Sequence, residues 1–143
     1  GALRACAVLL VALWCGYGFV VHPVLDDENS ARKVMQAARA AAGEGVEVGL
    51  VDWKEQNLLQ AVGPVAEFGF RQPVDVQLAR GLDWLAADPS RRLLVQRSAA
   101  LDCVDFTAGQ RIGRSNRREW WLLDAAALRG CPAPAGAPPA TGG

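Results

Sequence analysis

The chain has 143 residues, about half of them hydrophobic, and its 15 Lys and Arg residues balance 15 Asp and Glu residues. This balance excludes the basic surface of a typical nucleic-acid-binding protein, so we expect no nucleic-acid partner. The length allows one domain with a modest core beside a membrane segment. With a single histidine, His22, and no paired-cysteine spacing, the sequence predicts no metal site and no bound cofactor.

An uncharged stretch at residues 5–21 dominates the start of the chain, with Arg4 before it and acidic residues at 26–28 after it. As a helix continuing to Leu25, this stretch would extend about 31 Å, close to the hydrocarbon thickness of a bilayer. The sequence therefore predicts a transmembrane helix within residues 1–25, with the following domain on the outer side. A secretory signal peptide is the alternative.

Amphipathic helix and strand signals alternate after the apolar stretch. Residues 31–42 repeat apolar side chains on one helical face, and residues 73–87 do so with Leu78, Leu82 and Leu85. The other expected elements are strands at 46–53, 65–70 and 92–96, a short helix at 54–62, and a closing strand pair at 110–114 and 119–123 joined by Ser115 and Asn116.

This order of elements predicts an α/β fold, with one N-terminal transmembrane helix followed by a small α/β sandwich domain. Its mixed sheet is expected to be parallel in the first strands with an antiparallel edge. We expect the domain to cover residues 26–131. The last residues, 132–143, are rich in Pro, Gly and Ala and are expected to be a disordered tail.

The four cysteines fall into two pairs. Cys6 and Cys15 lie in the uncharged stretch, where they are expected to act as small apolar residues. Cys103 and Cys131 lie in the outer domain, where an extracytoplasmic location would allow a disulfide between them.

No catalytic signature is present in the sequence, and we expect no catalytic residue in it. One polar cluster, Lys54, Glu55, Gln56 and Asn57, directly follows the first expected strand. The carboxyl ends of strands are where open α/β sheets bind ligands, so these four residues are candidates for contacting a sugar or phosphate. The alternative is that they form the solvated first turn of a helix. Trp53, just before them, is expected in the core.

A second polar cluster surrounds the closing strand pair. Its candidate ligand contacts are Arg114, Asn116 and Arg117, with Arg111 and Arg118 nearby. Arginines at this density can hold a phosphate or pyrophosphate through paired hydrogen bonds. The alternative is that they keep the exposed edge of a hairpin soluble.

Several stretches together resemble a known family. They are the apolar helix with residues 26–32 (DDENSAR), residues 48–59 (VGLVDWKEQNLL), residues 67–70 (EFGF) and residues 116–122 (NRREWWL). With these, the chain over residues 5–131 resembles the C-terminal region of bacterial membrane glycosyltransferases, similar to the lipid A aminoarabinose transferase and the protein O-mannosyltransferases.

The resemblance implies a last membrane helix in the bacterial inner membrane and a periplasmic domain attached to it. Such enzymes move a sugar from a polyprenyl-phosphate donor to a lipid or protein acceptor. Their catalytic acidic residue lies in an earlier membrane-proximal loop that has no counterpart here, so no catalytic residue carries over. The expected partners are the lipid bilayer and, through the rest of the enzyme, the polyprenyl-phosphate-sugar donor and the acceptor.

Three interpretations therefore remain open. In the first, the chain is a fragment of such a glycosyltransferase, and its domain caps the periplasmic face of the enzyme. In the second, it is a free-standing single-pass, membrane-anchored periplasmic domain that binds a ligand or partner without catalysis. In the third, it is a truncated and inactive gene product.

Overall fold

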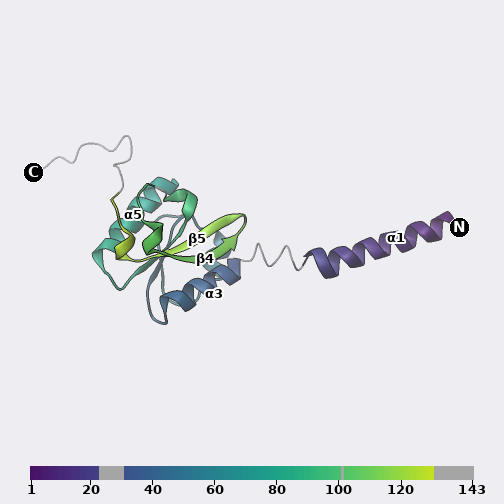
Figure 1. Ribbon diagram of the computed structural model, residues 1–143, viewed down its shortest axis with the longest axis horizontal. Coiled ribbons are helices and arrows are strands. Elements are labelled where there is room, and N and C mark those ends of the chain that lie inside the picture. Colours follow the sequence, from purple (N-terminus) through teal and green to yellow (C-terminus); the bar gives the residue numbers. More distant parts are fainter. Residues whose placement is uncertain (23–30, 101, 131–143) are drawn as a thin grey trace, which may run out of the picture.

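The computed structural model describes residues 1–22, 31–100 and 102–130, apart from the side chain of Gln56. Within these residues the chain forms an N-terminal helix and one α/β domain (Figure 1). The linker at residues 23–30 and the Pro/Gly/Ala tail at residues 132–143 lie outside the described residues, so the expected tail and the exact domain bounds stay predictions.

The N-terminal helix consists of α1 (Ala2–Gly16) and the π-helical turn η1 (Tyr17–Val21). The two form a continuous helix of 20 residues that is apolar apart from Arg4, and no side chain among them is buried in the domain. One N-terminal helix is thus long and apolar enough to span a membrane. A signal sequence has the same length and composition, so both interpretations of the apolar stretch stand.

The domain is built on a five-stranded mixed sheet with the strand order β2-β1-β3-β5-β4. Its strands are β1 (Val48–Leu50), β2 (Val65–Glu67), β3 (Arg92–Gln96), β4 (Gln110–Ser115) and β5 (Arg118–Leu123). The first strand runs parallel to β2 and β3, whereas β5 runs antiparallel to β3 and β4. The predicted mixed sheet with an antiparallel edge is therefore confirmed.

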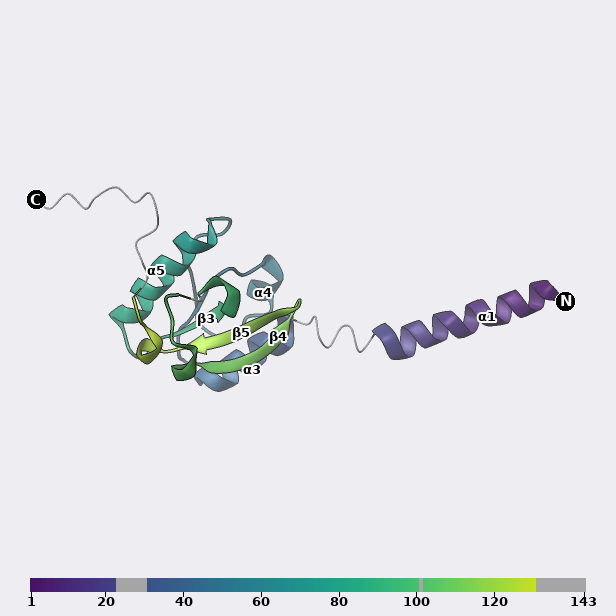
Figure 2. The ribbon, with the colours of Figure 1, turned by 45° about the horizontal axis from the view of Figure 1, so that its top comes forward.

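Helices cover both faces of this sheet (Figure 2). On one face, α3 (Ala31–Ala42) buries Val34, Met35 and Ala38 in a cluster with strand residues such as Leu50 and Leu94. The short α4 (Glu55–Leu59) contacts α3 on the same face.

On the other face, α5 (Val74–Ala87) buries Leu78, Leu82 and Leu85 in a second cluster with Leu93 and Val95. Because alternate residues of a strand point to opposite faces, Leu94 and its two neighbours serve different clusters. The domain is therefore a three-layer α/β sandwich with a core on each side.

Burial on both faces also explains a glycine in β1, an interior strand of the sheet. A β-carbon at Gly49 would lie 2.8 Å from the Leu93 Cδ1 atom and 2.8 Å from the Phe68 ring. The α5 helix and its connections pack so closely on β1 that no larger side chain fits there without displacing the core.

The element bounds follow the sequence signals closely in the helices and less closely in the strands. Helix α3 and strand β3 have the bounds that the sequence predicts, whereas β1 and β2 are each three residues long. The closing turn differs by one position, because Asn116 and Arg117 form it with φ angles of 52° and 63°. A two-residue hairpin turn with positive φ at both positions matches the strand twist, so Ser115 pairs with Arg118 instead of entering the turn.

Cys103 lies in the second core cluster and takes part in a disulfide, while Cys6 and Cys15 are free. Cys131, the expected partner of Cys103, lies outside the described residues, so the pairing stays a prediction.

The core accounts for a first prediction. Leu85 is fully buried between α5 and the sheet, so Leu85→Ala is expected to lower the free energy of unfolding by about 2–5 kcal/mol. Leu59→Ala removes the same atoms from a side chain that is 81 % exposed, and a change below about 0.5 kcal/mol is expected. Urea unfolding of the full chain in detergent, followed by tryptophan fluorescence, measures both. Equal losses for the two variants would contradict the assignment of the core.

Candidate functional site

The carboxyl ends of the three parallel strands meet at one end of the sheet. The connection after β1 leads to α4, on the face covered by α3, whereas the connection after β3 packs Ala100 and Cys103 beside α5 on the opposite face. Neighbouring strands whose connections leave to opposite faces create a crevice at their carboxyl ends, which is where ligands bind in open α/β sheets. The connection after β2 also leaves to that opposite face, where it leads to α5, so the residues just after β1 and its neighbours β2 and β3 are the candidates for a binding site.

A hollow of about 610 Å³ lies at this end, between the β1–α4 and β2–α5 connections. Its size is within the range of small-molecule binding sites. It is lined by Asp52, Trp53, Lys54, Glu55, Leu59, Phe70, Arg71, Gln72 and Gln77.

Two stacked aromatic rings contribute to the wall of the hollow. The ring centroids of Trp53 and Phe70 lie 5.1 Å apart with an interplanar angle of 27°. Trp53 is buried, as the sequence predicts, whereas Phe70 is 42 % exposed. The guanidinium carbon of Arg71 lies 5.2 Å from the Phe70 ring centroid, within range of a cation–π interaction. The hollow thus offers an aromatic surface beside a cation.

The backbone of Asp52 forms the other side of the hollow in an unusual conformation. Its φ of 53° lies in the left-handed region, which costs a non-glycine residue roughly 1–2 kcal/mol. Two buried glutamines hold this conformation. The Asp52 N–H donates to the Gln77 side-chain oxygen at 3.1 Å, and the Asp52 carbonyl accepts from the Gln96 side-chain nitrogen at 2.9 Å. Strain held in this way is typical of functional sites.

Arg118 completes this arrangement from the start of β5. It donates to the Asp52 carboxylate at 3.0 Å and to the Gln96 side-chain oxygen at 2.6 Å. Gln77 in turn donates to the Gln72 carbonyl at 2.7 Å. Side chains from α5, β3 and β5 thus fix the turn after β1, and the hollow beside this turn is held in shape by buried hydrogen bonds.

Only some residues of the first predicted cluster line the hollow. Lys54 and Glu55 are exposed and line the hollow. Asn57 is buried and caps α4, since its side-chain oxygen accepts from the Lys54 N–H at 3.0 Å. Asn57 does not line the hollow, and the side chain of Gln56 lies outside the described residues.

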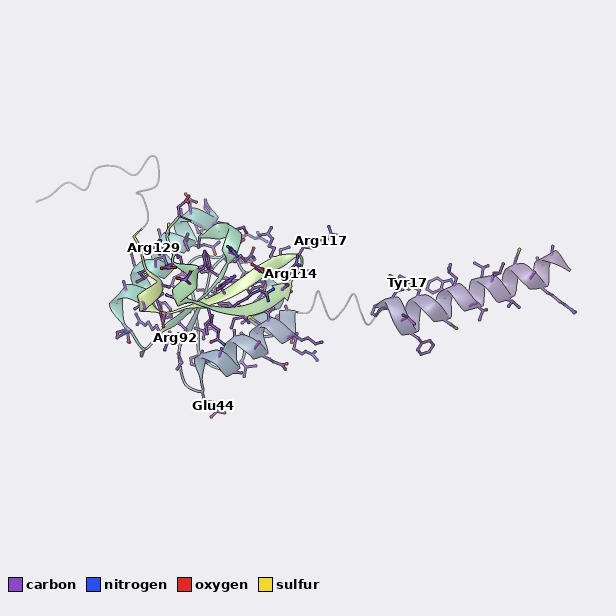
Figure 3. All side chains as sticks on the ribbon, in the orientation of Figure 1. Tyr17, Glu44, Arg92, Arg114, Arg117 and Arg129 are labelled. Atoms are coloured by element: carbon purple, nitrogen blue, oxygen red, sulfur yellow. The ribbon has the colours of Figure 1, made fainter. Side chains whose placement is uncertain are left out.

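In the second predicted cluster, some arginines form ion pairs with described residues and others do not. Glu119 accepts a hydrogen bond from Arg111 at 3.0 Å and lies 3.6 Å from Arg97. The hydrogen bond from Arg111 lowers the pKa of the Glu119 carboxyl group, which is therefore ionised at neutral pH. Arg114 and Arg117 are exposed at the closing turn and form no ion pair within the described part of the chain (Figure 3).

Arg114, Asn116 and Arg117 therefore lie at the same end of the domain as the hollow but do not line it. The arginine that reaches the crevice is Arg118, which is engaged with Asp52. The two predicted clusters therefore do not form one joint site among the described residues.

Several residues of the hollow were not found by sequence reasoning. Asp52 had one detectable signal, because it directly follows a buried strand and Asp tolerates the left-handed conformation. Gln77 had another, because it is a polar residue on the buried face of α5, one position before Leu78. The sequence carries no such signal for Phe70 and Arg71, because their positions depend on how the β2–α5 connection folds over Trp53.

Over the described ranges 1–22, 31–100 and 102–130, no three His, Cys, Asp or Glu side chains gather as metal ligands. A comparison with protein-family models, curated proteins and solved structures found no match.

The strain at Asp52 yields a second prediction. Asp52→Ala removes the carboxylate that Arg118 contacts and keeps a β-carbon in the left-handed conformation, so we expect the loss of the ion pair alone, about 0.5–1 kcal/mol in unfolding free energy. Asp52→Gly is the matched control, because glycine adopts positive φ without cost. It is expected to lose less than Asp52→Ala in urea unfolding of the full chain. A larger loss for the glycine variant would contradict strain at this position.

Proposed function

We propose that the chain is the C-terminal membrane helix and periplasmic domain of a polyprenyl-phosphate-sugar-dependent glycosyltransferase, and that the hollow binds a saccharide. The observation that carries this proposal is the aromatic and polar hollow at the carboxyl ends of the strands. Residues 52–57, which are part of the resemblance to this family, supply much of its lining. The catalytic residues would come from other parts of the enzyme.

The side chains of the hollow suit a sugar better than a purely apolar ligand. A sugar ring has C–H faces, which pack on aromatic rings, and hydroxyl groups, which need hydrogen-bond partners. Phe70 offers a half-exposed ring, while Glu55 and Gln72 offer acceptors and donors beside it. Lys54 and Arg71 add two cations to the same wall and favour a saccharide that carries a phosphate.

The apolar helix supports a location at the membrane. Its 20 residues from Ala2 to Val21 contribute nothing to the core of the domain, so their apolar surface is free for lipid. Under this proposal the helix lies in the bacterial inner membrane and the domain faces the periplasm.

A second function, a free-standing membrane-anchored binding domain, is favoured by a different observation. The domain completes a core on each face of its sheet from its own helices. Sequencing the gene upstream of Gly1 separates the two functions. A reading frame that continues through further hydrophobic helices supports the glycosyltransferase, and a start codon directly upstream supports the free-standing domain.

The hollow yields a third prediction. We expect the full chain in lipid nanodiscs to bind glucose 1-phosphate or mannose 1-phosphate more tightly than the free hexoses, as measured by ligand-observed NMR. Phe70→Ala removes the exposed ring and is expected to weaken binding about tenfold or more, which is about 1.4 kcal/mol.

Phe106→Ala is the matched control for this experiment. Phe106 also packs on a tryptophan, Trp121, with ring centroids 5.3 Å apart, but it does not line the hollow. Its variant should bind as the unchanged chain does. Absence of binding at about 10 mM ligand, where even a Kd near 1 mM would be detected, would rule out a site for these sugars.

A further inference from the structure

The end of the domain that carries the hollow is also the end at which the chain enters it from the apolar helix. Arg32, near the start of α3, donates to the Gln60 side-chain oxygen at 3.3 Å, just after α4. Arg39, near the end of α3, donates to the carbonyls of Val46 and Pro64, before β1 and β2. The start of α3 therefore lies beside the carboxyl ends of the strands (Figure 1). We call this end of the domain the tether end.

The linker is too short to let the tether end move far from a membrane. Eight residues separate His22 from Ala31. At about 3.3–3.6 Å per residue, the nine steps between these two residues span at most roughly 32 Å. This is about the diameter of a domain of 100 residues. If the apolar helix spans a bilayer, the linker holds the tether end within roughly this distance of the lipid headgroups.

Exposed cations that form no ion pair with another described residue lie at this end, whereas Arg92, which also forms none, donates to backbone carbonyls at the opposite end. Lys54, Arg71, Arg114 and Arg117 are exposed, and none of them forms an ion pair with another described residue. At the opposite end Arg129 is paired with Asp105 (Figure 3). The tether end also has acids, since Glu55, Glu67 and Asp75 are exposed near the hollow, but the closing turn with Arg114 and Arg117 lies at the other side of the sheet.

Exposed apolar side chains accompany these cations. Leu59, at the end of α4, is 81 % exposed and Phe70 is 42 % exposed, and both line the hollow. Aromatic and aliphatic side chains next to Arg and Lys are typical of protein surfaces that rest on a bilayer, where the apolar groups enter the headgroup layer and the cations contact phosphates.

We propose that the tether end docks on an anionic lipid surface, with Arg114 and Arg117 contacting lipid phosphates and Leu59 facing the headgroup layer. Charge complementarity and the short linker select this partner over a soluble protein. The competing partners for the arginines are the linker acids Asp26, Asp27 and Glu28. Docking would turn the hollow toward the bilayer, so that its ligand would be presented from the membrane surface. The docking itself does not depend on the identity of that ligand.

The test uses the full chain with Cys6→Ala and Cys15→Ala, which removes both free cysteines. A fluorophore is attached at Leu59→Cys, or at Glu44→Cys near the opposite end, and the protein is reconstituted in vesicles. Quenching by nitroxide-labelled headgroups is then compared between phosphatidylcholine alone and phosphatidylcholine with phosphatidylglycerol. We expect quenching of the Leu59→Cys label in the anionic vesicles, and little at Glu44→Cys.

The arginines are tested by the double variant Arg114→Gln and Arg117→Gln. At about 1 kcal/mol for each arginine near an anionic surface, the ratio of docked to free domain should fall about thirtyfold. The matched control, Arg92→Gln with Arg129→Gln, removes the same charge from the opposite end and should leave quenching unchanged. High salt should act like the loss of Arg114 and Arg117.

Two outcomes would overturn the proposal. Equal quenching at both label positions would mean that the domain has no preferred end toward the lipid. Quenching at Leu59→Cys that is independent of lipid charge and of Arg114 and Arg117 would mean that these arginines do not hold the domain on the lipid. Thermal unfolding of each variant verifies that the domain is folded in every comparison.

Discussion

The turn at Asp52 is the constraint on which the candidate site depends. The chain leaves β1 through a left-handed residue, and three side chains from α5, β3 and β5 hold that residue by hydrogen bonds. Because each bond comes from a different element, the turn cannot relax without loosening the sheet and α5 together. The same turn fixes the direction of Trp53 and Lys54, and therefore the shape of the hollow.

The order of strands explains why so many features share one end of the domain. With β1 between two parallel neighbours, the carboxyl ends of three strands meet there, and the antiparallel β5 must begin there. This brings the closing turn and Arg118 to the hollow's end of the sheet although they lie more than 60 residues after Asp52 in the chain. The start of α3 lies at that end because its helix runs back along the sheet to reach β1. The proposed ligand site and the proposed lipid-facing surface thus share one end because of a single topology.

The layers of the fold can be predicted from the sequence more reliably than the candidate site can. The periodicity of Leu78, Leu82 and Leu85 and the apolar face of α3 are determined by burial, which leaves a direct pattern in the sequence. The hollow depends instead on backbone conformations at Asp52 and at the closing turn, which tertiary hydrogen bonds select. A shift of one residue in that turn decides that Arg118, rather than Arg117, reaches Asp52. Such a difference has no signature in composition or spacing.

The charge distribution gives the two proposals a common physical basis. Asp52 and Glu119 neutralise the arginines that support the sheet, and exposed cations without an ion pair to a described residue remain at the rim of the hollow and at the closing turn. Surface ion pairs of this kind contribute little stability. Arginines that form no such pair contribute still less, so the stability of the fold does not account for them. A phosphate, on a saccharide or on a lipid, is the ligand that such unpaired cations select. The two sources differ in where the phosphate meets the domain, at Lys54 and Arg71 for the hollow or at Arg114 and Arg117 for the bilayer.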